Sequence, residues 1–185
     1  MNTAKPRFLP NEPFPPYSFV PGRFPHPTSD PAGHSFGQSP GSSRSGEPPG
    51  LSRRTPWPEC LPYLRGIDLF NHGYYWEAHE AWEGLWHAAG RRGPKADFLK
   101  GLIKLSAAGV KVRQGMPEGA RRHAARAGEL FRRAEGSLGP RYLGLSLNEL
   151  AGWAEAVLLR PPEAKDETAP VEVVFGFVLC PRDEQ

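Results

Sequence analysis

The distribution of proline constrains the fold of this chain most strongly, because thirteen of its 22 prolines lie in the first 56 of 185 residues. Proline fixes φ and removes a backbone donor, so this part cannot form regular helix and buries little surface by itself. We therefore expect residues 1–56 to be an extended arm and linker, disordered in part. The sequence further predicts one helical domain over residues 57–160 and a tail over residues 161–185.

The arm itself divides into two parts. Residues 8–36 interleave prolines with aromatic side chains, and we expect this extended part to dock along a groove on the folded body. Residues 38–54 have the composition of a flexible linker. The docking part carries His26, Asp30 and His34 at spacings of four. On extended chain this spacing does not bring the three together, so a ligand role for His26 or His34 would need a turn.

Beyond residue 56 the chain reads as helices separated by proline and glycine signals. Ser146 and Glu149 have the spacing of a capping box that opens the last helix. The β-branched, apolar residues 171–179 predict a short extended, strand-like segment that needs a partner, either the N-terminal segment or a second chain. We expect an all-α bundle of stacked helical hairpins, with helices over residues 58–71, 74–89, 94–114, 117 to about 136–139, and 146–160.

Charge is unevenly distributed along the chain. The formal net charge of +3 lies in residues 1–56, and the remainder is neutral. Residues 91–133 nevertheless hold twelve Lys and Arg against Asp97, Glu118 and Glu129. Such a segment attracts nucleic acid or other anions, or it balances an acidic helix within the fold. We favour internal balance. Nucleic acid is then the least favoured partner, and a small molecule, another protein or a second copy of the chain stay open.

Cysteine and hydropathy patterns bear on the compartment. Cys60 and Cys180 lie far apart and match no metal or redox spacing, so we expect free thiols. No apolar run approaches about 18 residues, and no charged segment followed by an apolar stretch opens the sequence. These observations predict a soluble, cytoplasmic protein without membrane attachment.

Residues 73–86 carry the chemistry of the chain, because they set a histidine and three carboxylates among large apolar side chains. At about 100° per residue, His79 and Glu83 lie at the rim of the buried face of this helix. Glu80 lies further round, and Glu77 points nearly opposite to the core. The buried face itself comprises Tyr75, Ala78, Trp82, Leu85, Trp86 and Ala89.

Two ligands at i and i+4 can chelate one divalent metal ion, as in the H-E-x-x-H helix of zinc proteases. Here the pattern is H-E-x-x-E, in which His79 and Glu83 would be ligands and Glu80 a general base. The alternative is a partly buried His79 hydrogen-bonded to Glu83, which fixes helix packing. A further ligand would come from His72, His123, His26 or His34.

The following helix has a single charged stripe about 40° wide, formed by Lys100, Lys104 and Lys111. The stripe is either an ordinary solvated face or is opposed by Glu80 and Glu83. In the second case charge pairing explains both sets without a metal ion. A partly desolvated Lys100 or Lys104 could instead bind an anion or act as a base.

Three segments carry a resemblance to a known family. They are L-F-N-H-G-Y-Y-W-E-A-H-E-A-W-E over residues 69–83, F-L-K-G-L-I-K-L over residues 98–105, and Gly119-Ala120. Together they resemble the small helical family called domain of unknown function 309, whose pattern runs roughly F-N-x-G-x-(F/Y)-(F/W)-E-A-H-E-x-W-E and then a G-L-I helix. The resemblance covers about residues 61–134. Residues 20–35 also look like a segment that precedes this domain in longer members.

The resemblance implies an all-helical bundle and the label "predicted metal-dependent hydrolase", which some classifications give on motif grounds. The motif residues that it implies here are Glu77, His79, Glu80, Trp82 and Glu83. The chain departs from the family at Lys100 and Lys104, where glutamine is common, and two added positive charges disfavour a cation nearby.

Two functions from different classes follow from these residues. The first is a metal-dependent hydrolase with a divalent metal cofactor, in which His79 and Glu83 bind the ion and Glu80 is the base. The second is a helical-hairpin binding module whose His/Glu/Lys cluster is structural or grips a peptide or an anion. An ion pair from Lys100 or Lys104 to a carboxylate of the motif would count against the metal enzyme.

Overall fold

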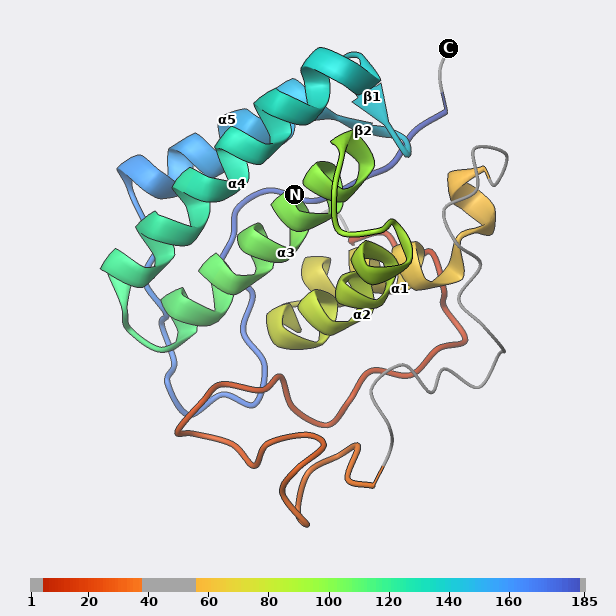
Figure 1. Cartoon of the computed structure of the whole chain (residues 1–185). Helices are drawn as coiled ribbons and strands as arrows, with labels where there is room; N and C mark the ends of the chain where they lie inside the picture. The colour runs from red at the N-terminus through yellow and green to blue at the C-terminus, as the bar shows by residue number, and fades with distance from the viewer. Residues whose placement is uncertain (1–4, 38–55, 184–185) are drawn as a thin grey trace.

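The computed structural model describes residues 5–37 and 56–183, and five α-helices form the body of this described part (Figure 1). This confirms the predicted all-α bundle, and each predicted helix corresponds to one in the structure. The short 3-10 helix η1 (Trp57–Glu59) precedes α1 (Leu61–Asn71), α2 (Tyr75–Ala88), α3 (Pro94–Arg113), α4 (Pro117–Leu138) and α5 (Leu147–Leu159).

Local signals fix where these helices begin and end. Pro94 and Pro117 occupy the first turns of α3 and α4, where no backbone donor is needed. The Ser146 hydroxyl accepts a hydrogen bond from the Glu149 amide at 3.3 Å and caps α5. Gly73 turns the chain between α1 and α2 with a φ of 91°, and a Cβ there would lie 2.6 Å from the Glu172 carbonyl oxygen. Glycine is therefore required at this turn.

Each helix packs against the next one along the chain, and α3 is the centre of the bundle (Figure 1). It lies between α2 and α4, while α1 covers α2 and α5 covers α4. A two-stranded antiparallel hairpin, β1 (Arg141–Tyr142) with β2 (Leu145–Ser146), joins α4 to α5 and was not predicted. Leu143 and Gly144 form its turn with positive φ values of 47° and 78°, as a type I′ turn requires.

The tail over residues 171–179 is extended, but none of it is a β-strand. Its backbone groups bind to side chains of the first two helices. The Tyr75 hydroxyl accepts from the amides of Val174 at 3.0 Å and Phe175 at 3.4 Å. The Asn71 amide group both donates to and accepts from the backbone of Leu179, each at 2.8 Å. The partner that the sequence pattern requires is thus a pair of side chains.

Residues 5–37, red to orange in Figure 1, run along α1 and α2. The Asp68 carboxylate, fully buried, accepts the amides of Phe8 and Leu9, each at 2.8 Å. Phe14 stacks on Tyr74 with ring centroids 4.8 Å apart. The expected linker over residues 38–54 lies outside the described residues.

Two smaller expectations concern thiols and membranes. Cys60 is buried and Cys180 is half-buried, and both are free thiols as predicted. Within residues 5–37 and 56–183, every helix is too short or too polar to cross a membrane.

Candidate functional site

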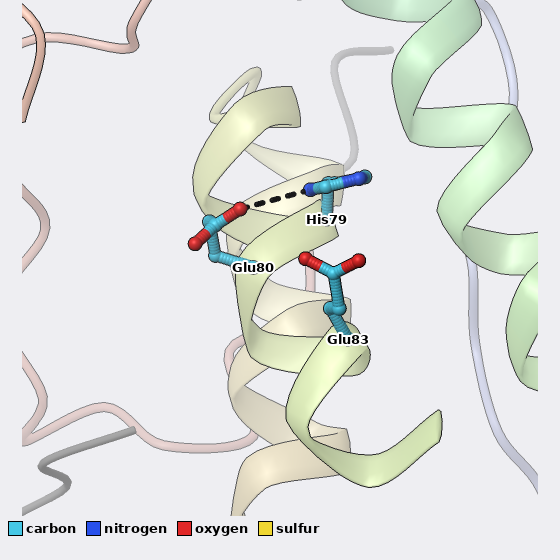
Figure 2. Close-up of side chains that lie close together, drawn as sticks. All are labelled: His79, Glu80 and Glu83. Atoms are coloured by element: carbon cyan, nitrogen blue, oxygen red, sulfur yellow. Dashed lines mark hydrogen bonds and ion pairs between the residues drawn. The ribbon is translucent and has the colours of Figure 1, made fainter. Parts of the chain in front are cut away.

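His79, Glu80 and Glu83 form a half-buried cluster on one side of α2 (Figure 2). Each offers one ligand atom, and these atoms all lie within 4.8 Å of one another. The His79 Nδ1 and Glu80 Oε1 atoms lie 3.2 Å apart, and the two side chains are 27% and 35% exposed. Glu83 lies one turn further along, with its carboxylate turned toward the other two. The structure therefore brings together the three residues of the H-E-x-x-E pattern.

The core side chains of α2 fix how the helix is rotated, and so where this cluster points. Trp82 is fully buried, and its indole N–H donates to the Tyr63 carbonyl oxygen at 3.2 Å. A Cβ at Gly66 would clash with the Trp82 ring, so α1 and α2 approach closely here. Trp82, which the family motif groups with the cluster, is thus a core anchor with its only polar atom already bonded.

Glu77 is buried at 7% exposure, although its angle on the helix points away from the core. Residues 5–37 cover that side of α2. The Glu77 carboxylate accepts the Phe19 amide at 2.8 Å and the Ser18 hydroxyl at 3.1 Å. Its Oε1 atom also lies 3.4 Å from His34 Nε2. Glu77 therefore holds the arm and is separate from the cluster.

The arm histidines do not join the cluster. His34 contacts Glu77, and its side chain is 8% exposed. The His26 ring stands edge-on to Trp76 and Phe19, with centroids 5.4 and 4.9 Å away. The His72 Nδ1 atom lies 2.8 Å from the Asp68 carbonyl oxygen. Within the described residues, the group of candidate metal-ligating side chains consists of His79, Glu80 and Glu83 alone.

The lysine stripe of α3 lies beside the cluster without pairing to it. Lys100 Nζ sits 3.8 Å from the centroid of the Trp86 ring, in a cation–π contact. Burial lowers the pKa of Lys100; the positive charge of Lys104 lowers it further, whereas Glu83 raises it. Among the described residues, no ion pair within 4.0 Å joins either lysine to Glu80 or Glu83. Direct charge pairing thus does not account for the two sets of charges.

His123 of α4 belongs to the same electrostatic environment. Burial lowers its pKa to about 4, with further lowering from the positive charges of Lys104, Lys111, Arg122 and His79. The sequence offered His123 as a candidate further ligand, but in the described residues it is not among the ligand atoms grouped with His79. Its closeness to His79 depends on how α2, α3 and α4 pack, and no local pattern reports that.

The donor set of the cluster suits a divalent ion such as Zn²⁺, because one imidazole and two carboxylates are ligands it accepts. Three protein ligands would leave a fourth position for water or substrate. Two cavities of about 120 Å³ lie elsewhere, one beside Trp153 and Arg182 and the other beside Gly128 and Leu158. Neither is lined by the cluster.

Residues 63–123 match the family profile described as "Domain of unknown function (DUF309)". About a third of the chain is thus similar to the DUF309 family. The DUF309 segment begins in α1, contains α2 and α3, and ends in the first turns of α4. It therefore includes the whole cluster, the lysine stripe and His123. No curated protein and no solved structure matches the chain.

Proposed function

We propose that the DUF309 segment holds a divalent metal ion at His79 and Glu83 and acts as a metal-dependent hydrolase with Glu80 as general base. The observation that supports this is the presence of three ligand atoms within 4.8 Å on one rigid helix. The side chains are half-buried, so a substrate can approach while the local dielectric is lower than in water.

The other polar residues of the motif have structural roles that account for them. Asn71 and Tyr75 bind the tail, and Glu77 binds the arm. By contrast, His79, Glu80 and Glu83 lie against one another, and His79 is hydrogen-bonded to Glu80.

The chemistry divides among the three side chains. A bound divalent ion supplies Lewis acidity and favours deprotonation of water at neutral pH. His79 and Glu83, one turn apart, are the pair that would hold it. Glu80, hydrogen-bonded to His79, would be the general base that accepts a proton from the attacking water.

Metal content by mass spectrometry tests this function, on untagged protein purified without chelator. We expect near-stoichiometric metal in the parent protein and its loss in the double variant His79→Ala/Glu83→Ala. The matched control is Glu118→Ala/Glu129→Ala, which removes two exposed carboxylates from α4 and should retain the metal. Absence of metal from the parent protein would contradict the proposal.

A binding module is the second candidate, and the cation–π contact of Lys100 with Trp86 supports it. That contact holds a positive charge beside Glu83, which disfavours a cation at the cluster. The metal measurement separates the two functions. Under the second, the His79/Glu83 variant loses stability while the parent protein carries no metal.

A further inference from the structure

Helix α3 exposes one narrow strip between α2 and α4. Of its residues from 98 to 112, only four are not buried: Lys100, Lys104, Ala107 and Lys111. Three of these carry a positive charge, and the fourth is the smallest side chain of the strip. Ala107 therefore interrupts a row of lysines, with Lys104 three residues before it and Lys111 four residues after it.

One contact sets the register of α2 against this strip. Lys100 lies over the ring of Trp86, and the two helices run in opposite directions through the short connection after α2. His79 lies seven residues before Trp86, and Ala107 lies seven residues after Lys100. Both intervals are two turns, or about 10 Å of helix rise. His79 therefore lies level with Ala107.

A second contact sets the register of α4 on the other side. The alkyl chain of Lys111 packs against Gly119, where a Cβ would lie 2.9 Å from Lys111 Cδ. His123 lies four residues after Gly119, and Ala107 lies four residues before Lys111. Each interval is about one turn. His123 is therefore also level with Ala107, so the two histidines flank the same point of α3.

The charges around this point lack carboxylate partners. In residues 56–183, Arg121, Arg126, Arg132 and Arg133 of α4 each form an ion pair. The same part of the structure has no ion pair for Lys104, Lys111 or Arg122. Burial lowers the pKa of His123, and the positive charges of Lys104, Lys111 and Arg122 lower it further, which agrees with the register of α4. Lys104, one turn from Ala107, and Arg122, next to His123, thus carry positive charges that no ion pair engages in this part of the structure.

We propose that the position over Ala107, between His79 and His123, binds the phosphate group of a phosphorylated small-molecule substrate, with Lys104 as its principal cation. A phosphate dianion matches several point charges that converge from two helices. His123, neutral at pH 7, can donate one N–H to it. Ala107 is half-buried and contributes only a methyl group between Lys104 and Lys111.

In this proposal the phosphate group serves to recognise the substrate. Because the phosphate position adjoins His79, the bound substrate would lie beside the metal cluster. The assignment to a substrate rests on the proposed hydrolase function, whereas the anion site does not. Nucleic acid is disfavoured because the nearby arginines of α4 are already paired, which leaves a single unpaired centre and no extended basic surface.

Calorimetric titration with inorganic phosphate tests the site, on protein stripped of metal by a chelating resin, at pH 7 and low ionic strength. We expect saturable binding that Lys104→Met weakens at least tenfold. Ala107→Leu should weaken binding as much, because it fills the position without changing charge. Arg126→Met removes a paired cation of α4 and should leave the affinity within twofold. Circular dichroism confirms that each variant is folded.

Several results would overturn the site. They are the absence of saturable binding, equal losses in Lys104→Met and Arg126→Met, full binding in Ala107→Leu, and acetate or a single-stranded oligonucleotide binding as well as phosphate does. Since the titration contains no metal, its failure leaves the metal cluster untouched. A protein that binds phosphate but carries no metal keeps the anion site and contradicts the hydrolase.

Discussion

At the scale of single residues, the buried carboxylate of Glu77 accepts hydrogen bonds from residues 5–37. In a β-sheet, the backbone of a neighbouring strand would accept such bonds. It accepts the Phe19 amide and the Ser18 hydroxyl in a site from which solvent is excluded. A buried donor left without an acceptor costs about 1–3 kcal/mol, more than the hydrogen bond itself contributes.

Glu77→Ala should therefore lower the free energy of unfolding by about 1–3 kcal/mol in urea denaturation. The matched control is Glu129→Ala, which removes an exposed carboxylate from α4 and should change stability by less than about 0.5 kcal/mol. Equal effects of the two substitutions would show that residues 5–37 contribute nothing through Glu77.

His123 makes stability depend on pH in a defined direction. Its folded pKa of about 4 lies below the usual value of 6.5, so between these values the unfolded chain binds a proton that the folded chain does not. Stability should therefore be complete above pH 6.5 and fall as the pH drops toward 4.

His123→Gln should reduce this dependence in urea denaturation carried out from pH 7 to pH 4. Lys104→Met should raise the pKa of His123 in an NMR titration, because it removes a positive charge. An unchanged pKa would place Lys104 too far away to act on His123.

At the scale of elements, the α1/α2 hairpin depends on one close approach. Gly66 faces Trp82 with no room for a Cβ, whereas a Cβ at Gly84 on α2 would meet nothing within 4 Å. The two glycines thus have opposite roles in the same pair of helices.

Gly66→Ala should destabilise the protein by about 1–3 kcal/mol, because the methyl group forces the helices apart. Gly84→Ala should stabilise it by about 0.5–1 kcal/mol, since alanine restricts the unfolded chain and favours helix. Thermal unfolding measures both changes. Melting temperatures that shift in the same direction would contradict the close packing.

Helix positions were predictable from sequence because their signals are local. Pro94, Pro117 and the Ser146 cap each act within one turn of their own helix. The β1–β2 hairpin was missed because two-residue strands give almost no alternation to detect. In the candidate site, the H-E-x-x-E spacing predicted the cluster. The position of His123 relative to His79 depends on the registers of α2 and α4 against α3. The residue pattern of a single helix cannot give these registers.

At the scale of the whole molecule, two extended segments cover the hairpin that carries the cluster. Residues 5–37 bind Asp68 and Glu77, and residues 174–179 bind Asn71 and Tyr75. No sequence pattern predicted which side chains bind these segments, because the partners are far apart in the sequence. Asn71 and its partner Leu179, for example, are 108 residues apart. The angle of Glu77, opposite to the core, was the one available sign that another segment covers α2.

Asn71→Ala should loosen the tail, since it removes both hydrogen bonds to Leu179. Hydrogen exchange of peptides covering residues 171–183 should become faster, and unfolding free energy should fall by about 1–3 kcal/mol. Asn148→Ala, at an exposed position of α5, is the control and should leave exchange in the tail unchanged.

The tail also determines when, during synthesis, the α1/α2 hairpin can gain all of its contacts. Asn71 and Tyr75 are made about 100 residues before the backbone groups that they bind. At about 5–20 residues per second, synthesis separates them by roughly 5–20 s. During that interval Asn71 and Tyr75 lack their tail partners, and the side of Phe70 that stacks on Phe175 is uncovered. Apolar surface exposed in this way favours aggregation until the tail binds.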